Sequence, residues 1–262
     1  MLLVIDYGNT NGVFAVYDGE ELRGMWRSAS DPRKTADEYA VWLTQLMGLN
    51  GLQPGDIDGV VISNVVPLAQ RALNTLCERY FKQSPVTVEQ AVAHIPFQIR
   101  MAQPRQVGAD RIANAVGAHG RYQGALILVD FGTATTFDVI GADGGYEGGV
   151  ICPGINLSMD ALFTGAARLP RIAVEKPQRV IGSDTVTAMQ SGVFWGYIGL
   201  IEGLVARIKA EYGQPMKVVA TGGLAPLFYG TTAAIDEVDA DMTLRGLLTL
   251  YRAATQASGG KT

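Results

Sequence analysis

One short pattern occurs twice in this chain and constrains its fold more than any other feature. It is an apolar run that ends in Asp, an aromatic residue, Gly and, directly or one residue later, Thr. The copies are Leu2–Thr10 and Leu126–Thr133, and their aspartates, Asp6 and Asp130, stand 124 positions apart in 262 residues. Each run predicts a buried strand, and the turn after it can offer N–H and hydroxyl groups to an anion. One copy alone also fits an ordinary turn, but two copies favour two similar halves facing one nucleotide.

The composition excludes several classes of protein. Hydrophobic residues make up 48% of the chain, enough for one large core or two smaller ones. A net charge of −4 gives no basic surface for nucleic acid or an anionic membrane, so a small-molecule substrate is expected. No apolar run approaches the ~18 residues of a membrane span and Met1 leads directly into a strand, which predicts a cytoplasmic protein without membrane contact. The two cysteines and two histidines stand apart, which argues against a disulfide, a zinc site and histidine-based nucleophilic catalysis.

The first half predicts a three-stranded meander followed by parallel strands and helices. The second and third strands are expected at Gly12–Tyr17 and Glu21–Arg27, joined at Asp18-Gly19, a strong hairpin signal. Thr35 and Glu38 form a capping box that begins a helix. The remaining elements are a strand over Ile57–Ser63, a helix over Pro67–Phe81 with Leu68, Ala72, Leu73 and Leu76 facing inward, and a strand over Pro85–Val88.

The second half repeats this order. A helix from Gly108 through His119 carries the chain across, so the expected domains are residues 1–105 and 106–262. Three strands are expected at Ala125–Asp130, Thr135–Ile140 and Tyr146–Ile151, after which Cys152-Pro153-Gly154 breaks the sheet. The last elements are helices over Asn156–Ala167, Ser183–Tyr212 and Thr243–Ser258 and a strand over Lys217–Ala220.

The turns carry donors for phosphate but no lysine, because the first lysine of the chain is Lys34. A phosphate beside Asp6 would therefore be held by backbone N–H groups, by Asn9 and Thr10, and through a cation on the Asp6 carboxylate. In the second turn Asp130 could ligate a hard cation and Thr133 a phosphate oxygen. Thr221-Gly222-Gly223 is a weaker signal that also fits a simple turn. Gly260-Lys261-Thr262 is rejected as a P-loop, since it lacks the first glycine and a following helix.

Two further motifs fall on predicted helices. Asp110 and Arg111 are adjacent at a helix start and point in different directions, so one can serve the chemistry while the other holds an anionic substrate. The alternative is a capping Asp with a surface Arg, which the surrounding motifs make less favoured. The longest predicted helix carries a glycine stripe that fits close packing within the subunit or self-association: Gly192, Gly196, Gly199 and Gly203.

With these motifs assembled, the chain resembles the type III pantothenate kinases of the acetate and sugar kinase, Hsp70 and actin superfamily. The resemblance extends from Leu3 to about Leu248. It rests on these motifs, in this order: Asp6–Thr10, Gly108–Asn114, Asp130–Thr135, Gly148–Gly154, Met189–Gly192 and Thr221–Gly223. It implies an α/β fold of duplicated ribonuclease H-like (actin-like) domains, each with a three-stranded antiparallel meander, parallel strands and covering helices. The implied activity is phosphorylation of pantothenate by ATP to 4'-phosphopantothenate, the first step toward coenzyme A.

The resemblance also implies roles for individual residues. Asp110 would accept the proton of the substrate hydroxyl, and Asp130 would hold a monovalent cation, K⁺ or NH₄⁺. Mg²⁺ would accompany ATP near Asp6. Thr185 would reach the pantothenate site of a partner subunit, so a homodimer is expected. The implied ATP contacts are Asp6, Tyr7, Gly8, Asn9, Thr10, Asn11, Gly12, Val13 and Thr133, and the pantothenate pocket would include Met101, Gly108, Ala109, Asp110, Arg111 and Thr185.

The chain departs from the family pattern at three places. Met101 stands before Ala102-Gln103-Pro104 where the family usually has a tyrosine that touches pantothenate, Ala15 replaces a glycine, and the residue after Asp6 is the bulky Tyr7. No catalytic group is lost. Two rivals remain open: a nucleotide-binding regulatory protein, such as a transcription accessory factor, that keeps the fold without turnover, and a phosphatase or sugar kinase of the same superfamily. The second lacks support from the Gly-x-Asp-Arg motif.

Overall fold

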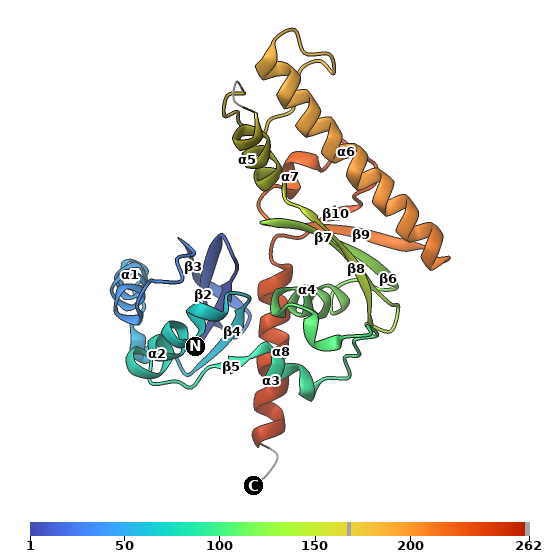
Figure 1. Cartoon of the computed structure of the whole chain (residues 1–262). Helices are drawn as coiled ribbons and strands as arrows, with labels where there is room; N and C mark the ends of the chain where they lie inside the picture. Colours follow the sequence, from blue (N-terminus) through green and yellow to red (C-terminus); the bar gives the residue numbers. More distant parts are fainter. Residues whose placement is uncertain (167–168, 260–262) are drawn as a thin grey trace. The chain divides into compact units, whose positions relative to one another are not determined.

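The computed structural model describes residues 1–166 and 169–259 and contains two five-stranded sheets (Figure 1). Gly260-Lys261-Thr262 and Ala167, the expected end of a helix, lie outside the described residues. The chain divides into two compact units. The first is Met1–Gln98, Ala102–Arg121 and the chain from Met242 onward, and the second is Ile99–Met101 with Tyr122–Asp241.

The first unit is built on a mixed sheet of order β3-β2-β1-β4-β5. Strand β1 pairs antiparallel with β2 and parallel with β4, and β2 continues the meander to β3. Gly19 makes the predicted β2–β3 turn with φ +62°, a conformation that suits glycine. The elements of this unit are β1 (Leu2–Tyr7), β2 (Asn11–Asp18), β3 (Glu21–Ala29), α1 (Ala36–Leu49), β4 (Gly59–Asn64), α2 (Gln70–Tyr80), β5 (Val86–Thr87), α3 (Val88–Ala91), α4 (Ala109–His119) and α8 (Met242–Gly259).

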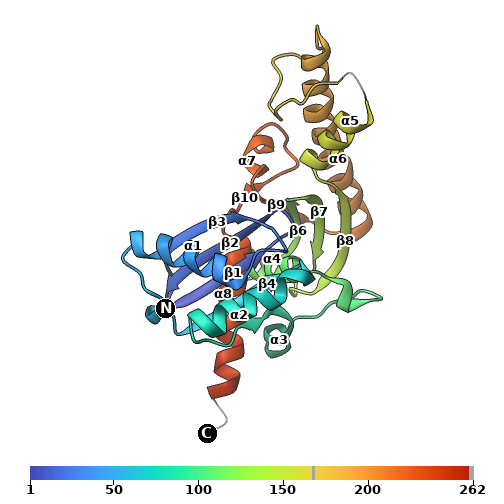
Figure 2. The ribbon, with the colours of Figure 1, turned by 60° about the vertical axis from the view of Figure 1, so that its left-hand side comes forward.

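Helices cover both faces of the first sheet, as Figure 2 shows for α1, α2 and α8. The face of Ile5, Tyr7 and Ile62 packs against buried residues of α1 and α2. The opposite face meets α8, because a Cβ on Gly59 would lie 1.8 Å from the Tyr251 hydroxyl. Side chains alternate along a strand, so Asp6 lies on the face opposite that of Tyr7.

The second unit repeats the sheet in the order β10-β9-β6-β7-β8. Strand β6 pairs antiparallel with β7 and parallel with β9, as β1 does with β2 and β4. This confirms the expected fold of duplicated halves, each with a meander and parallel strands. Helices α5, α6 and α7 contribute to one aromatic and aliphatic core with the sheet. The elements are β6 (Ala125–Phe131), β7 (Ala134–Ile140), β8 (Tyr146–Pro153), α5 (Ile155–Gly165), α6 (Thr185–Tyr212), β9 (Met216–Thr221), α7 (Ala225–Phe228) and β10 (Glu237–Val238).

The composition of the two units differs from the expected division of the chain at a single boundary between residues 105 and 106. Helix α8 belongs with the first sheet and α4, where two glycines allow close backbone contact: a Cβ on Gly246 would lie 1.9 Å from the Ala113 carbonyl oxygen. Thr243 Oγ1 also donates to Asn114 Oδ1 at 2.6 Å. The return of the last helix to the first unit depends on this packing, which the linear order does not reveal.

Two local predictions were wrong. Leu68 was expected to face inward, but it lies in a short 3-10 turn, Pro67–Ala69, before α2 and is 77% exposed. Cys152 and Pro153 were expected to break the sheet, but both belong to β8. Strand β8 is an edge strand, and proline is tolerated there because the residues on its outer side have no neighbouring strand to which an N–H would donate.

Candidate functional site

The turn after β1, Gly8–Asn11, is called the phosphate loop after the role that the sequence predicts for it, and it is exposed at Asn9, Thr10 and Asn11. Its base is fixed by Tyr7, whose ring is fully buried and whose hydroxyl lies 2.6 Å from that of Tyr39. The Tyr7 ring therefore anchors the loop from within the core and does not face a nucleotide. At the other end Gly12 is buried, and a Cβ there would lie 2.7 Å from the Tyr7 ring, so a glycine is needed.

Ser63 lies beside Asp6, a neighbour that the sequence did not single out. The two residues are partners in the parallel pairing of β1 and β4, so their side chains share one face of the sheet. Ser63 is fully buried, and its hydroxyl has no hydrogen-bond partner among the described residues. The signal was present as a polar residue that ends the apolar run Val60–Ile62.

The start of α4 presents Asp110 and Arg111. Gly108 is the N-cap, and Asp110 Oδ1 accepts a hydrogen bond from the Arg111 N–H at 2.8 Å. A Cβ on Gly108 would lie 2.5 Å from that same oxygen, so only glycine leaves the carboxylate room. Burial raises the pKa of Asp110 above its ordinary 3.8, while the hydrogen bond and charge of Arg111 act in the opposite direction. The capping alternative is not favoured, because Gly108 and not Asp110 occupies the cap.

The phosphate loop and the start of α4 lie at the same edge of the first sheet. Val65, which follows β4, donates its N–H to the Tyr7 carbonyl at 3.1 Å. The Val65 side chain also lies 3.6 Å from where a Cβ of Gly108 would be. Both motifs therefore gather where the parallel strands β1 and β4 end, a place where α/β sheets commonly bind ligands.

The second unit holds the equivalent turn. Phe131 is buried and stacks on Phe228 with ring centroids 5.1 Å apart, whereas Thr133 is exposed. Asp130 precedes Phe131 and so lies on the opposite face of the sheet, as Asp6 does in the first unit. The two aspartates thus occupy equivalent places in the two sheets.

Met101 and Thr185 also belong to the second unit. Met101 follows Arg100, whose N–H donates to the Tyr146 carbonyl at 2.8 Å and whose guanidinium pairs with Asp143 and Glu147. Thr185 is the exposed first residue of α6, after the N-cap Asp184. The structure thus places the phosphate loop and Gly108–Arg111 in one unit and Met101, Asp130, Thr133 and Thr185 in the other.

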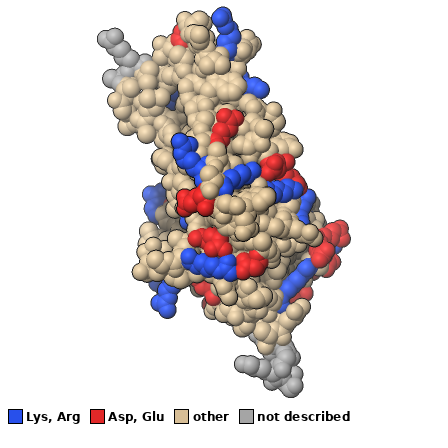
Figure 3. All heavy atoms as spheres, turned by 90° about the vertical axis from the view of Figure 1, so that its right-hand side faces the viewer, with Lys and Arg blue, Asp and Glu red and all other residues tan. Residues whose placement is uncertain are grey.

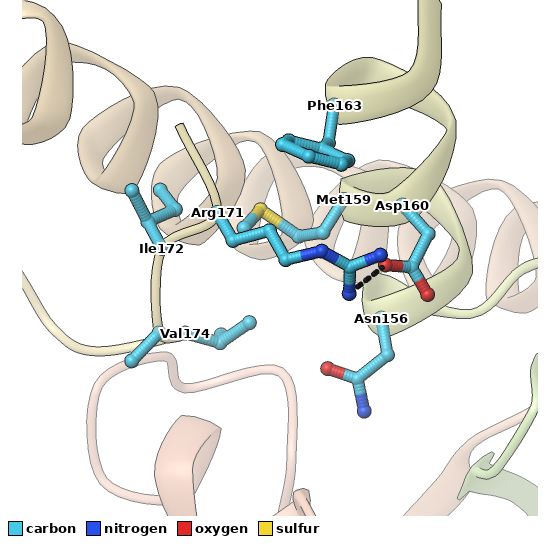
Figure 4. A pocket seen from close by; sticks show the side chains of 8 residues that line it. Asn156, Met159, Asp160, Phe163, Arg171, Ile172 and Val174 are labelled. Atoms are coloured by element: carbon cyan, nitrogen blue, oxygen red, sulfur yellow. Dashed lines mark hydrogen bonds and ion pairs between the residues drawn. The ribbon is translucent and has the colours of Figure 1, made fainter. Parts of the chain in front are cut away.

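The described part of the second unit includes two cavities of interest. One, of about 310 Å³, lies between α5 and the segment Arg171–Val174, where the Arg171 guanidinium meets Asp160 and the Phe163 ring (Figure 4). It contains none of the predicted site residues. The other, of about 760 Å³, is mostly apolar and is lined from α5 and α6 by residues that include Thr185, Met189, Gly192 and Gly196.

Charged side chains on one face of the molecule, and the possible metal ligands of the described residues, are dispersed. On the face shown in Figure 3 basic and acidic side chains are interspersed, without a broad area of one sign. Within residues 1–166 and 169–259 no group of three or more His, Cys, Asp and Glu side chains is arranged to hold a metal ion. None of the described helices combines the length and apolarity that crossing a membrane requires.

The duplicated sheets and the two Asp–Gly–Thr turns define a protein of the ribonuclease H-like, actin-like class. Solved structures of that architecture are similar to this chain: a conserved putative Baf family transcriptional activator from Campylobacter jejuni (TM-score 0.62, 19% identity, covering 97% of this chain and 99% of that one) and a putative 2-dehydro-3-deoxygalactonokinase from Sinorhizobium meliloti (TM-score 0.62, 14% identity, covering 98% and 96%). At these identities the likeness establishes the fold alone.

Sequence comparison gives the family. The model of the type III pantothenate kinase family matches residues 2–207. A type III pantothenate kinase of Phenylobacterium zucineum is 60% identical over 96% of this chain and 98% of its own length, and one of Caulobacter vibrioides is 55% identical over 98% and 99%. The chain belongs to the type III pantothenate kinase family.

Proposed function

We propose that this protein transfers the γ-phosphoryl group of ATP to the primary hydroxyl of pantothenate and so forms 4'-phosphopantothenate for coenzyme A synthesis. Family membership over nearly the whole chain supports the substrate. The observation that carries the chemistry is the placement of Asp110, a carboxylate at a helix start beside the phosphate loop.

Asp110 would orient the substrate hydroxyl and take its proton as the new O–P bond forms and the bond to ADP breaks. Its raised pKa makes it a stronger base than an ordinary aspartate. The adjacent Arg111 and the N-terminal end of α4 provide positive charge for the pantothenate carboxylate. Phosphoryl transfer depends mainly on such positioning and charge stabilisation, since the transition state is loose.

The proposed cations fit the donor set. Mg²⁺ usually keeps several waters and takes one or two carboxylates together with phosphate oxygens, and the single carboxylate of Asp6 at the strand end suits that role. The ion would neutralise charge on the transferred phosphoryl group. Asp130 is a hard oxygen ligand suited to K⁺ or NH₄⁺, and the exposed Thr133 would contact ATP. The cytoplasmic location expected from the sequence stays a prediction.

We also propose a homodimer through α6. Of the two explanations for the glycine stripe, packing within the subunit finds no support: a Cβ on Gly192, Gly196 or Gly199 would meet nothing within 4 Å among the described residues. These glycines are exposed beside the apolar cavity that Thr185 lines. A second copy would cover this face and would receive Thr185 in its pantothenate pocket. Gly196→Arg should give a folded monomer by light scattering; a Gly196→Arg dimer would refute this interface.

The activity is tested by incubating the purified protein with ATP, Mg²⁺, K⁺ and one acceptor at a time. We expect 4'-phosphopantothenate by mass spectrometry from pantothenate, and no product from glucose or acetate. Nucleotide binding without any phosphorylated product would support the regulatory alternative. Product from a sugar but not from pantothenate would favour a sugar kinase.

A further inference from the structure

Ser30, the residue directly after β3, contacts the phosphate loop twice. Its N–H donates to the Thr10 carbonyl at 2.9 Å, and its hydroxyl donates to the Gly8 carbonyl at 2.6 Å. Neither the composition nor the motifs of the chain pointed to this serine. One residue therefore holds two alternate carbonyl groups of a short, exposed turn.

These contacts decide where the loop's donors point. In a trans peptide unit the C=O and the N–H point in opposite directions. The peptide unit that joins Gly8 to Asn9 turns its oxygen toward Ser30, so the Asn9 N–H points away from β3. The unit that joins Thr10 to Asn11 does the same with the Asn11 N–H. Both amides thus point away from the strand that holds the loop, and backbone amides of an exposed turn can bind an anion.

The second unit makes the same contact with different chemistry. Gly154 directly follows β8, the third strand of its meander, as Ser30 follows β3. Its N–H donates to the Thr133 carbonyl at 3.0 Å, as that of Ser30 does to Thr10. A Cβ on Gly154 would lie 2.2 Å from the Thr133 oxygen and 2.7 Å from that of Gly132, so the glycine backbone packs directly on both carbonyls. The backbone N–H bond recurs where the residue type does not, and the carbonyl that the Ser30 hydroxyl holds in the first unit has its counterpart in the Gly132 carbonyl beside Gly154.

We infer that Ser30 is a positioning residue for the nucleotide: its hydroxyl holds the Gly8 carbonyl so that the amides of the phosphate loop are presented to the ATP phosphates. The inference rests on the proposed function, since it assigns the loop to ATP. The hydrogen bonds of Ser30 go to the phosphate loop, at the Gly8 and Thr10 carbonyls, so the inference assigns it to the nucleotide and not to pantothenate. Its removal should therefore affect nucleotide binding selectively.

The test compares Ser30→Ala with Ser30→Thr, which keeps the hydroxyl. Ser28→Ala is the matched control, because Ser28 Oγ donates to the Ala29 carbonyl at 3.1 Å and accepts from Lys34 Nζ at 3.0 Å, and within the described part of the chain its hydroxyl is not bonded to the phosphate loop. Loss of one hydrogen bond predicts about a fivefold rise in the KM for ATP in Ser30→Ala. The KM for pantothenate should stay at the wild-type value, and Ser30→Thr should restore the KM for ATP. Thermal unfolding of all variants checks that each is folded.

Binding of Mg·ADP, followed by calorimetry, separates this inference from the proposed function. If the wild type binds Mg·ADP but phosphorylates no pantothenate, the proposed function fails while the Ser30 effect on binding can still be measured. A Ser30→Ala variant with wild-type affinity for Mg·ADP would overturn the inference. So would equal rises in both KM values, or a loss of nucleotide affinity that Ser30→Thr does not restore, because a merely structural role would produce those results.

Discussion

The two turns proposed to bind phosphate, after β1 and after β6, have the same place in the fold and different supports. Each follows the first strand of a sheet with the same strand order, and each is preceded by an Asp on one face and a buried aromatic ring on the other. In the first unit the ring carries a hydroxyl that meets Tyr39, whereas Phe131 stacks on Phe228. In both units a backbone N–H after the third strand holds the turn, and in the first unit a serine hydroxyl adds a second bond, whereas in the second the glycine backbone lies close to both carbonyls. The backbone contact is common to both units, while the side chains differ.

The largest expected effect is that of Asp110→Asn, which should impair catalysis without impairing nucleotide binding by the two turns. Asp110→Asn should lower kcat by about 10² to 10⁴, the usual contribution of a general base, while binding of Mg·ADP stays near the wild-type value. Because burial raises the pKa of Asp110 in the folded protein, the acid limb of the wild-type kcat/KM profile should lie above 3.8. A kcat unchanged in Asp110→Asn would remove the proposed role.

The same variant should be at least as stable as the wild type at neutral pH. Because the pKa of Asp110 is higher in the folded protein than in the unfolded chain, the folded protein binds the proton more tightly. The protonated carboxyl therefore stabilises the fold at pH values below the unfolded-state pKa. This stabilisation is lost as the pH rises through the folded-state pKa, and the ionised carboxylate then carries the cost of its burial. The neutral amide removes that cost at pH 7. Urea unfolding of both proteins at pH 5 and pH 8 measures this difference in the free energy of unfolding. If Asp110→Asn were less stable than the wild type by a larger margin at pH 8 than at pH 5, the raised pKa would be contradicted.

Gly154→Ala tests the contact in the second unit. The new Cβ would need a shift of the Thr133 and Gly132 carbonyls, and a displacement of that size can cost about 10²-fold in activity. The loss of activity should exceed that in Ser30→Ala. Ser30→Ala removes one side-chain hydrogen bond, whereas Gly154→Ala forces the backbone of the turn to move. Gly48→Ala on α1, where a Cβ meets nothing within 4 Å, is the control. Wild-type kinetics in Gly154→Ala would mean that the two contacts are not equivalent.

Asp6 and Asp130 should bind different ions, Mg²⁺ at Asp6 and a monovalent cation at Asp130. If Asp130 holds a monovalent cation, replacing K⁺ by Na⁺ should lower the wild-type rate severalfold, and Asp130→Asn should lose that response. Asp6→Asn should keep the K⁺ response and require more Mg²⁺. Rates measured in matched chloride buffers decide this. Equal wild-type rates in Na⁺ and K⁺ would exclude a selective monovalent site.

The smallest effect concerns the anchors of the turns. Tyr7→Phe leaves the buried Tyr39 hydroxyl without its partner and should lower the free energy of unfolding by about 1–3 kcal/mol. Burial, and after it the hydrogen bond with Tyr7, raises the pKa of Tyr39 above its ordinary 10.0, so Tyr39 stays neutral up to about pH 9. The loss of unfolding free energy in Tyr7→Phe should therefore be the same at pH 6 and at about pH 9. Tyr80→Phe, whose hydroxyl bonds to the exposed Asp37, should change stability by about 0.5 kcal/mol or less. Equal losses in both variants would show that the buried pair is not special.

Local signals predicted most secondary structure because their physics is local. The capping box of Thr35 and Glu38 is present, with the Thr35 N–H donating to Glu38 Oε2 at 2.7 Å, and it begins α1 as expected. Buried strands were predicted from apolar runs that end in polar residues. Short elements such as α7 and β10 were missed, since two to four residues carry too little pattern.

The sequence nominated residues for the candidate site but not the contacts that support them. Asp6, Asp110 and Asp130 each stand in a recognisable sequence pattern, and their roles stay predictions. Ser30 and Ser63 were missed because a lone serine gains meaning only from the strand beside it. The sequence alone determined the duplicated fold and the family, since strand periodicity and turn chemistry are written in neighbouring residues. Tertiary structure alone decided that α8 returns to the first sheet, that the Tyr7 ring lies in the core and that Ser30 holds the loop, because these contacts join residues far apart in the chain.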